Sequence, residues 1–386
     1  MDERDTNLKN KTLLLFFTYR VSLEIWKNAG TLERDMVLYK ELMQSGMNVI
    51  FVTYGGKKDI AIAEEYGIDV IANTKRLPIV LYAILLPLLI KRRNIKVDIV
   101  KSHQFIGIIP AVMTSAILNV PYIARGGYIP TFFFKQGRKK IFSVEWFKLI
   151  FCIVDEWLIT HFADIISLPS DEEIQYIQER HPSAKVRCVS IPNWVNTELF
   201  HPMSSGPKIR DVIFVGRFEA QKNPLLFLES LRGIDGVRAT MIGGGKLFGE
   251  IKAYIKKYAL DCIVYETRIP NEDLPIILNN HRVAVLPTEF EGGSPKTLLE
   301  AMACGLPIVS TDTFGTRNLF LWKESVGILC VLDAKKMSEA IQYLLLHPDV
   351  SDVFGANGRA YVNACFSLSA TLKKETHLLA SLVNHT

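Results

Sequence analysis

One segment of the chain combines residue types that bind a charged, hydroxyl-rich ligand. Residues 289–312 read EFEGGSPKTLLEAMACGLPIVSTD, which predicts an acidic, glycine-rich loop, then a helix, then a buried strand. Ser294 suits the N-cap of the helix and Pro295 its first position, while Gly305 predicts its end. Free N–H groups at a helix N-terminus bind anions such as phosphate, and nearby carboxylates can hold sugar or ribose hydroxyls. A well-capped surface helix without a ligand is the simpler interpretation.

A second segment carries two cations behind a short strand. Residues 211–224 read DVIFVGRFEAQKNP, in which 212–215 is apolar and Gly216 permits a tight exit. Arg217 and Lys222 then lie in a loop before a helix that starts near Asn223. A planar guanidinium and a point charge five residues apart suit a diphosphate. The alternative is a pair of solvated basic residues.

The two segments together resemble a known family. EGGSPKTLLEAMACGLP resembles the signature of the retaining GT-B glycosyltransferases of family 4, the glycosyl transferases group 1, and VGR followed by a lysine resembles their donor-phosphate site. Glu300 matches the second of two glutamates in this signature. Counting back eight residues for the first one gives Gly292, so we assign that role to Glu291, with Glu289 as the alternative.

The resemblance implies a set of site residues. Catalysis would involve Glu291, Arg217, Lys222 and His103, of which His103 follows the strand 97–101. A histidine that only caps the next helix is the alternative for His103. The residues implied in donor binding are Glu300, Gly216, Gly244, Arg268, Ser294, Pro295, Lys296 and Thr297, and those implied in acceptor binding are Arg125 and Gly126.

Other features bear on cofactors and on departures from the family. No D-x-D pair is present, so we expect neither a metal nor a cofactor, with the nucleotide-diphosphate sugar as co-substrate. The family's glycine-rich first loop is replaced by 18–22, TYRVS, and its later glycine pair, proline and glutamate by 314–318, FGTRN.

The bulk sequence predicts two α/β domains. A chain of 386 residues, 49% hydrophobic, is too long for one ordinary core. Alternating strands and helices predict parallel sheets, and the resemblance implies the GT-B fold: two doubly wound, Rossmann-like domains facing across a cleft. We expect an acceptor domain at 1–190, a linker at 191–202, a donor domain at 203–365, and a helix at 366–386 that could pack back on the first domain. The expected strands are 12–17, 48–52, 69–71, 97–101, 122–124, 165–168, 186–191, 212–215, 237–246 with three glycines at its end, 283–286, 307–310 and 328–331.

Charge is concentrated in residues 75–148, where thirteen Lys and Arg stand against two acidic residues, a net charge of +11 in a chain of +5. Aromatic residues interleave with them, and 77–90 is an apolar run too short to span a bilayer. This predicts a peripheral surface for anionic lipid, with a buried helix and a solvated basic end as the alternative. No nucleic-acid-binding module is visible.

These features predict a retaining glycosyltransferase that uses a nucleotide-diphosphate sugar for a glycan or lipid-linked acceptor in cell-surface polysaccharide or glycolipid assembly. The alternatives are a degenerate GT-B protein that binds without turnover and a GT-B nucleotide-sugar epimerase. The charged N-terminal residues do not resemble a signal peptide, and six scattered cysteines predict buried thiols in a reducing compartment. We therefore expect a cytoplasmic protein, working at the inner face of the membrane.

Overall fold

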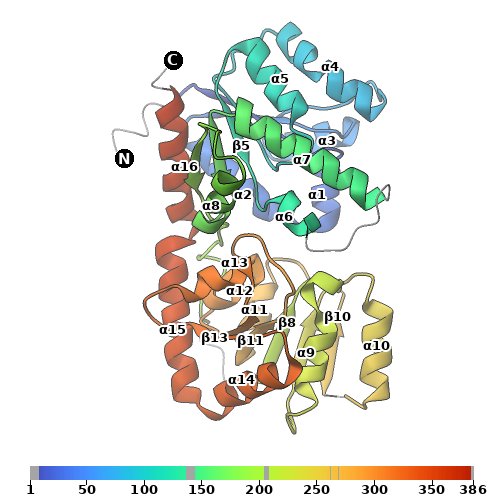
Figure 1. Ribbon diagram of the computed structural model, residues 1–386, viewed down its shortest axis with the longest axis vertical. Coiled ribbons are helices and arrows are strands. Elements are labelled where there is room, and N and C mark those ends of the chain that lie inside the picture. Colours follow the sequence, from blue (N-terminus) through green and yellow to red (C-terminus); the bar gives the residue numbers. More distant parts are fainter. Residues whose placement is uncertain (1–7, 136–143, 204–207, 261, 268, 384–386) are drawn as a thin grey trace. The chain divides into compact units, whose positions relative to one another are not determined.

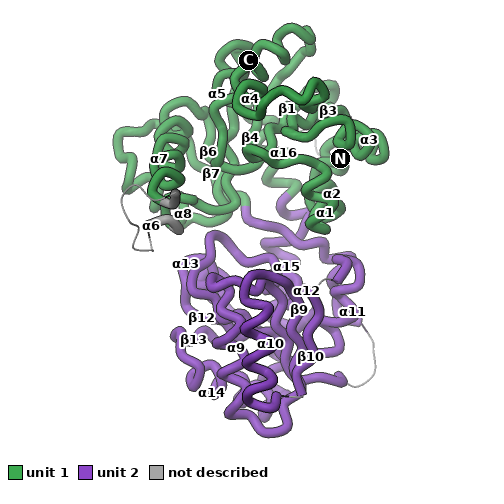
Figure 2. Tube along the Cα trace, turned by 90° about the vertical axis from the view of Figure 1, so that its right-hand side faces the viewer, with its two compact units in different colours: residues 1–191, 372–386 green, residues 192–371 purple. Residues whose placement is uncertain are grey.

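The computed structural model describes residues 8–135, 144–203, 208–260, 262–267 and 269–383. The chain divides into two compact units, residues 1–191 with 372–386 (unit 1) and residues 192–371 (unit 2), which are coloured separately in Figure 2. Each unit is built on one parallel sheet with helices on both of its faces (Figure 1).

Unit 1 contains a seven-stranded sheet in the order β3-β2-β1-β4-β5-β6-β7. Its strands are β1 Thr12–Phe16, β2 Asn48–Val52, β3 Asp69–Ile71, β4 Ile99–Ser102, β5 Tyr122–Arg125, β6 Ile165–Leu168 and β7 Arg187–Ser190. Its helices are α1 Leu23–Ala29, α2 Leu32–Gln44, α3 Lys57–Glu65, α4 Ile79–Arg92, α5 Ile109–Leu118, α6 Pro130–Lys135, α7 Val144–Phe162, α8 Asp171–Arg180 and most of α16 Leu368–Val383.

Unit 2 contains a six-stranded sheet in the order β10-β9-β8-β11-β12-β13. Its strands are β8 Val212–Val215, β9 Ala239–Ile242, β10 Ile263–Glu266, β11 Val283–Leu286, β12 Ile308–Thr311 and β13 Gly327–Cys330. Its helices are α9 Pro224–Leu231, α10 Phe248–Lys257, α11 Leu274–Asn279, α12 Lys296–Ala303, α13 Phe314–Arg317, α14 Ala334–Leu346 and α15 Pro348–Cys365, with the 3₁₀ turns η2 Ala220–Lys222 and η3 Asn318–Phe320.

The expected strands are confirmed, with ends that shift by one or two residues, except that the strand expected at 237–246 stops at Ile242, before its three glycines. Strand β10 was not expected, because its sequence IVYE is only partly buried and gives no long apolar run. The prediction of buried thiols is wrong for four of the cysteines. Cys152 and Cys304 are buried, whereas Cys188, Cys262, Cys330 and Cys365 are partly exposed.

The sheet of unit 1 separates two apolar layers. Along β1, Leu13 and Leu15 face one layer, and Leu14 and Phe16 face the other, as the alternation of side chains in a strand requires. The first layer is covered by α1, α2, α3 and α16, and the second by α4, α5, α7 and α8. None of the helices that the structure describes is long and apolar enough to cross a bilayer.

A buried ion pair attaches the C-terminal helix to the sheet of unit 1. Lys101 on β4 is 1% exposed, and its ammonium group contacts the carboxylate of Glu375 on α16, which is 2% exposed. Burial lowers the pKa of Lys101, and the charge and hydrogen bond of Glu375 oppose that shift. Each charge is therefore tolerable only because the other is present.

We predict that Lys101→Met alone lowers the free energy of unfolding by roughly 3 kcal/mol or more, because it leaves Glu375 buried without its cation. The double variant Lys101→Met with Glu375→Leu should recover most of this loss. Urea unfolding measures both, and Lys58→Met, which removes the exposed pair with Glu24, is the control and should change little. Equal stability of the wild type and Lys101→Met would contradict the prediction.

Candidate active site

Two loops of unit 2 meet at the carboxyl edge of its sheet. Strands β8 and β11 are hydrogen-bonded neighbours, although about 70 residues separate them along the chain. The loop 216–223 follows β8, and the loop 287–295 follows β11. Because the strands are parallel, both loops emerge at the same edge, where ligands bind in open α/β sheets.

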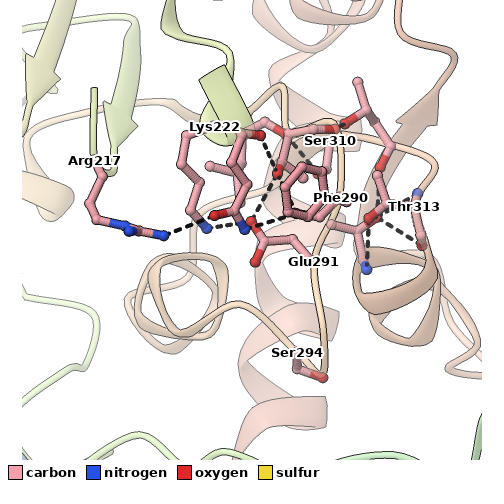
Figure 3. Close-up of polar contacts among 12 residues, drawn as sticks. Arg217, Lys222, Phe290, Glu291, Ser294, Ser310 and Thr313 are labelled. Atoms are coloured by element: carbon pink, nitrogen blue, oxygen red, sulfur yellow. Dashed lines mark hydrogen bonds and ion pairs between the residues drawn. The ribbon is translucent and has the colours of Figure 1, made fainter. Parts of the chain in front are cut away.

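The loops are joined by a contact between Lys222 and Glu291 (Figure 3). The ammonium group of Lys222 contacts Oε1 of Glu291, and the hydroxyl of Thr288 donates to the same oxygen at 2.9 Å. Glu291 is 6% exposed, whereas Glu289 is exposed at the outer side of the loop. Of the two acids that the sequence left open, Glu291 is thus the one held beside a predicted phosphate cation.

Gln221 connects the two loops through both its side chain and its backbone. Its Oε1 accepts from the Arg217 guanidinium at 2.8 Å, and its Nε2 donates to the Phe290 carbonyl at 3.0 Å. Its own carbonyl accepts from the amide of Glu289 at 2.8 Å and from the hydroxyl of Thr288 at 2.9 Å. Sequence reasoning missed Gln221, because nothing in its local pattern indicates bonds to residues nearly 70 positions away.

The helix of the glycine-rich segment begins one residue later than expected. Pro295 is the cap residue, with φ −66° and ψ 124°, and α12 starts at Lys296. The prediction that Ser294 caps the helix is therefore wrong, because the extended Pro295 places Ser294 outside the first turn. Ser294 is buried, and its carbonyl accepts from the Asn193 amide at 3.1 Å.

The first turn of α12 holds further predicted donor residues. The Lys296 ammonium lies 5.1 Å from the centre of the Trp194 ring. Thr297 is half-buried in the same turn, and Glu300, one turn further along, is 5% exposed. The structure thus brings Lys296, Thr297 and Glu300 together at the end of α12 that follows the Glu291 loop.

Two glycines allow backbone segments to approach closely here. A Cβ on Gly243, after β9, would lie 1.9 Å from the Gly216 carbonyl oxygen. The backbones of the loops after β8 and β9 therefore come too close at this point for any residue but glycine at position 243. A Cβ on Gly315 would lie 2.4 Å from the Gly293 carbonyl oxygen, so the start of α13 rests on the Glu291 loop. The segment 314–318, FGTRN, differs from the family pattern, but its glycine, Gly315, stands where the close packing leaves no room for a side chain.

Gly244 and Arg268 are the two remaining residues of the predicted donor site. Gly244 lies beside Gly243, and its carbonyl accepts from the Phe218 amide at 2.9 Å. Arg268 lies outside the described residues. In the described part of the chain, no three His, Cys, Asp or Glu side chains form a cluster that could hold a metal ion.

The predicted acceptor residues lie together in unit 1. Arg125, at the end of β5, donates to the His103 carbonyl at 3.2 Å, and the His103 ring lies 4.9 Å from the Trp26 ring. Gly126 is buried, and a Cβ there would lie 2.8 Å from the Phe105 ring. His103 and Arg125 thus lie at the carboxyl edge of the unit 1 sheet, and Gly126 follows directly.

Backbone amides at the start of α1, after the first loop of unit 1, are hydrogen-bonded to side chains of the protein itself. The carboxylate of Asp59, which is fully buried, accepts from the amides of Leu23 and Glu24 at 3.1 and 3.2 Å. Ser22 caps the amide of Ile25. These groups occupy the start of α1 where the family has its glycine-rich loop, and nothing in the local sequence around Asp59 indicated this role.

A buried carboxyl also lies under the loop that follows His103. Asp155 on α7 accepts from the amide of Gly107 at 2.9 Å. Burial raises the pKa of Asp155 to about 7, although hydrogen bonds from Gly107 and Ile108 oppose the shift. The carboxyl thus holds the loop 103–108 through its backbone.

Comparisons with known proteins agree with this architecture. A sucrose-phosphate synthase from Thermosynechococcus elongatus superimposes with a TM-score of 0.77 at 19% identity, over 98% of this chain and 100% of the other. Anabaena HepE, solved in complex with UDP, superimposes with a TM-score of 0.74 at 17% identity, over 96% of this chain and 100% of the other. Two Rossmann-like parallel-sheet units with these neighbours define the GT-B class of fold.

The unit that carries the Lys222–Glu291 contact also matches a family model. Residues 198–361 match the family described as glycosyl transferases group 1. An Escherichia coli protein named UDP-Gal:alpha-D-GlcNAc-diphosphoundecaprenol alpha-1,3-galactosyltransferase is 27% identical over 259 residues, which are 62% of this chain. The match spans 63% of that relative's length.

Proposed function

We propose that the protein is a retaining glycosyltransferase of family 4, which transfers a sugar from a nucleotide-diphosphate donor to an acceptor hydroxyl. The observation that carries this proposal is the joined pair of loops in unit 2, where Lys222, Glu291 and Arg217 converge within the segment that matches the glycosyltransferase family model. The donor would bind in unit 2, and the acceptor hydroxyl would come from the side of His103 and Arg125.

The proposed chemistry assigns one role to each group. The bond between the anomeric carbon and the diphosphate breaks, the acceptor oxygen forms a bond to that carbon, and the acceptor proton passes to an oxygen of the departing diphosphate. Arg217 and Lys222 stabilise the charge that develops on the departing diphosphate, and the N–H groups at the start of α12 bind phosphate oxygens. Glu291 orients the sugar, and Glu300 binds the ribose hydroxyls.

The proposed acceptor is a lipid-linked or membrane-bound glycan, and the proposed location is the cytoplasmic face of a membrane. Two observations support this. The name of the Escherichia coli relative includes a diphosphoundecaprenol acceptor, and residues 75–148 carry a net charge of +11. No cofactor or metal is proposed beyond the donor itself.

A screen of UDP-, GDP- and ADP-sugars by thermal shift tests the donor assignment. A true donor at about 100 times its dissociation constant should add roughly 2.7 kcal/mol of stability. With that donor, NMR of the product should show the anomeric configuration of the donor retained. An inverted product would refute retention. An isomerised nucleotide-sugar would favour an epimerase, and binding without donor hydrolysis or transfer would favour a degenerate binding protein.

We predict that Arg217→Ala lowers turnover by roughly 100-fold, as losing one electrostatic donor to a transition state does. Its melting temperature should not change, because Arg217 is exposed. Lys222→Ala should lower turnover at least as much and also lower the melting temperature, because the buried Glu291 loses its cation. Steady-state donor turnover is the measurement, with the exposed Lys256→Ala as the matched control. Normal turnover in both variants would rule out the phosphate assignment.

Replacing the two acids of the loop should have very different effects on turnover. We predict that Glu291→Gln is nearly inactive, because Glu291 is buried beside Lys222, and that the exposed Glu289→Gln loses only a few-fold in turnover at most. Glu289 is the natural control, since it lies two residues away in the same loop. The reverse order would reassign the sugar contact to Glu289, and two mild effects would support a protein without turnover.

A further inference from the structure

The solvent-facing side of helix α7 is apolar. Its two described acids, Asp155 and Glu156, are 1% and 3% exposed, so the negative charges of this helix point inward. Seven large apolar side chains instead expose between 39% and 58% of their area: Phe147, Ile150, Phe151, Ile153, Val154, Trp157 and Phe162. At 100° per residue they cover about half of the helix circumference. This is the inverse of an ordinary surface helix.

Helices α4 and α5 extend this apolar surface. On α4 the exposed residues form a stripe with helical spacing, namely Val80, Leu81, Ile84 and Leu88, and on α5 they are Ile109 and Met113. Helix α4 packs against α5, and α5 packs against α7, so the three helices lie side by side on unit 1, as Figure 1 shows. We call the outer side of these three helices the apolar face.

The core of unit 1 does not need the apolar face. The inner sides of the same helices already fill the apolar layer under the sheet, through Tyr82, Leu86 and Ile90 on α4, Ala111 on α5 and Ile159 on α7. Large exposed apolar side chains gathered on three neighbouring helices mark an interaction site in a folded protein. The outer side chains therefore have a separate role, which is to meet another apolar medium.

The charges around the apolar face select the occupant. Helix α4 ends in Lys91 and Arg92, followed by Arg93, all of them exposed, and Lys148 is exposed on α7. Among the described side chains of the three helices, no acidic residue is exposed. A second copy of the chain would bring two cationic rims together, which is unfavourable. An anionic lipid surface offers apolar chains beneath negative headgroups and complements both features.

We propose that the apolar face docks on the surface of an anionic lipid bilayer. The apolar side chains of α4, α5 and α7 enter the interfacial region, and Lys91, Arg92 and Arg93 lie at the level of the headgroups. The aromatic rings of Phe151 and Trp157 suit this boundary. This inference rests on the membrane location proposed above, for which it names the surface, but not on the transfer reaction. Failure of the binding assay would remove that location and leave the glycosyltransferase proposal standing.

Vesicle flotation of the full chain tests the proposal. At 0.1 M salt, the wild type should float with vesicles of phosphatidylglycerol and phosphatidylcholine and stay behind with vesicles of phosphatidylcholine alone. Ile84→Glu with Phe151→Glu should reduce binding at least tenfold. The control is Leu346→Glu with Val353→Glu, which adds the same charge at two exposed apolar positions of unit 2 and should bind normally. Unchanged melting temperatures verify that the variants are folded.

A second measurement reports directly on the face. Trp157 fluorescence should shift to shorter wavelength with anionic vesicles, and the shift should be lost in Trp157→Phe. Failure of the wild type to bind anionic vesicles, or equal binding by the Ile84→Glu, Phe151→Glu variant, would overturn the proposal. Light scattering of the free protein tests whether a second copy of the chain covers the apolar face instead. A wild-type dimer that this variant converts to monomer, without vesicle binding, would identify the face as a contact between copies.

Discussion

The contact between Lys222 and Glu291 is the interaction on which the candidate active site depends. It joins two loops that leave neighbouring parallel strands, and it buries a carboxylate that would be costly without its cation. Thr288 and Gln221 also join the two loops, by neutral hydrogen bonds to backbone carbonyls. The cation proposed to act on the donor diphosphate and the acid proposed to act on the adjacent sugar are thereby fixed relative to each other. In this site a structural ion pair and the proposed catalytic groups are the same residues.

The sheets could be predicted from sequence because buried parallel strands form apolar runs between turns. Strands such as β8, VIFV, and β11, VAVL, have no polar residue to obscure them. Strand β10, IVYE, lies at the edge of its sheet and is only partly buried, so its sequence contains polar residues and lacks a clear apolar run. The start of α12 was predicted one residue too early for a different reason. A serine before a proline fits an N-cap, and only the backbone angles of Pro295 show that the helix has not begun there.

The contacts that shape the site were much less predictable. Gln221 reaches Phe290 and Asp59 reaches Leu23 across 69 and 36 residues, and both contacts follow from packing between elements, not from local pattern. A family resemblance supplies the residues that share a motif with other proteins. It does not supply residues such as Gln221 and Asp59, whose roles depend on which loops this fold brings together. Glu291 and Glu289 are also alike in the sequence, and only the folded loop makes Glu291 buried and Glu289 exposed.

The apolar run 77–90 shows why hydropathy alone could not decide between a buried helix and a surface for lipid. The structure contains features of both. One side of α4 packs in the core through Leu86 and Ile90, while Ile84 and Leu88 are exposed on the other. A helix that is apolar all round requires apolar surroundings on every side. Unit 1 provides them on one side only, and α7 has the same imbalance with its acids turned inward. The composition of these helices is therefore explained by two apolar environments, the protein core and a second one outside it.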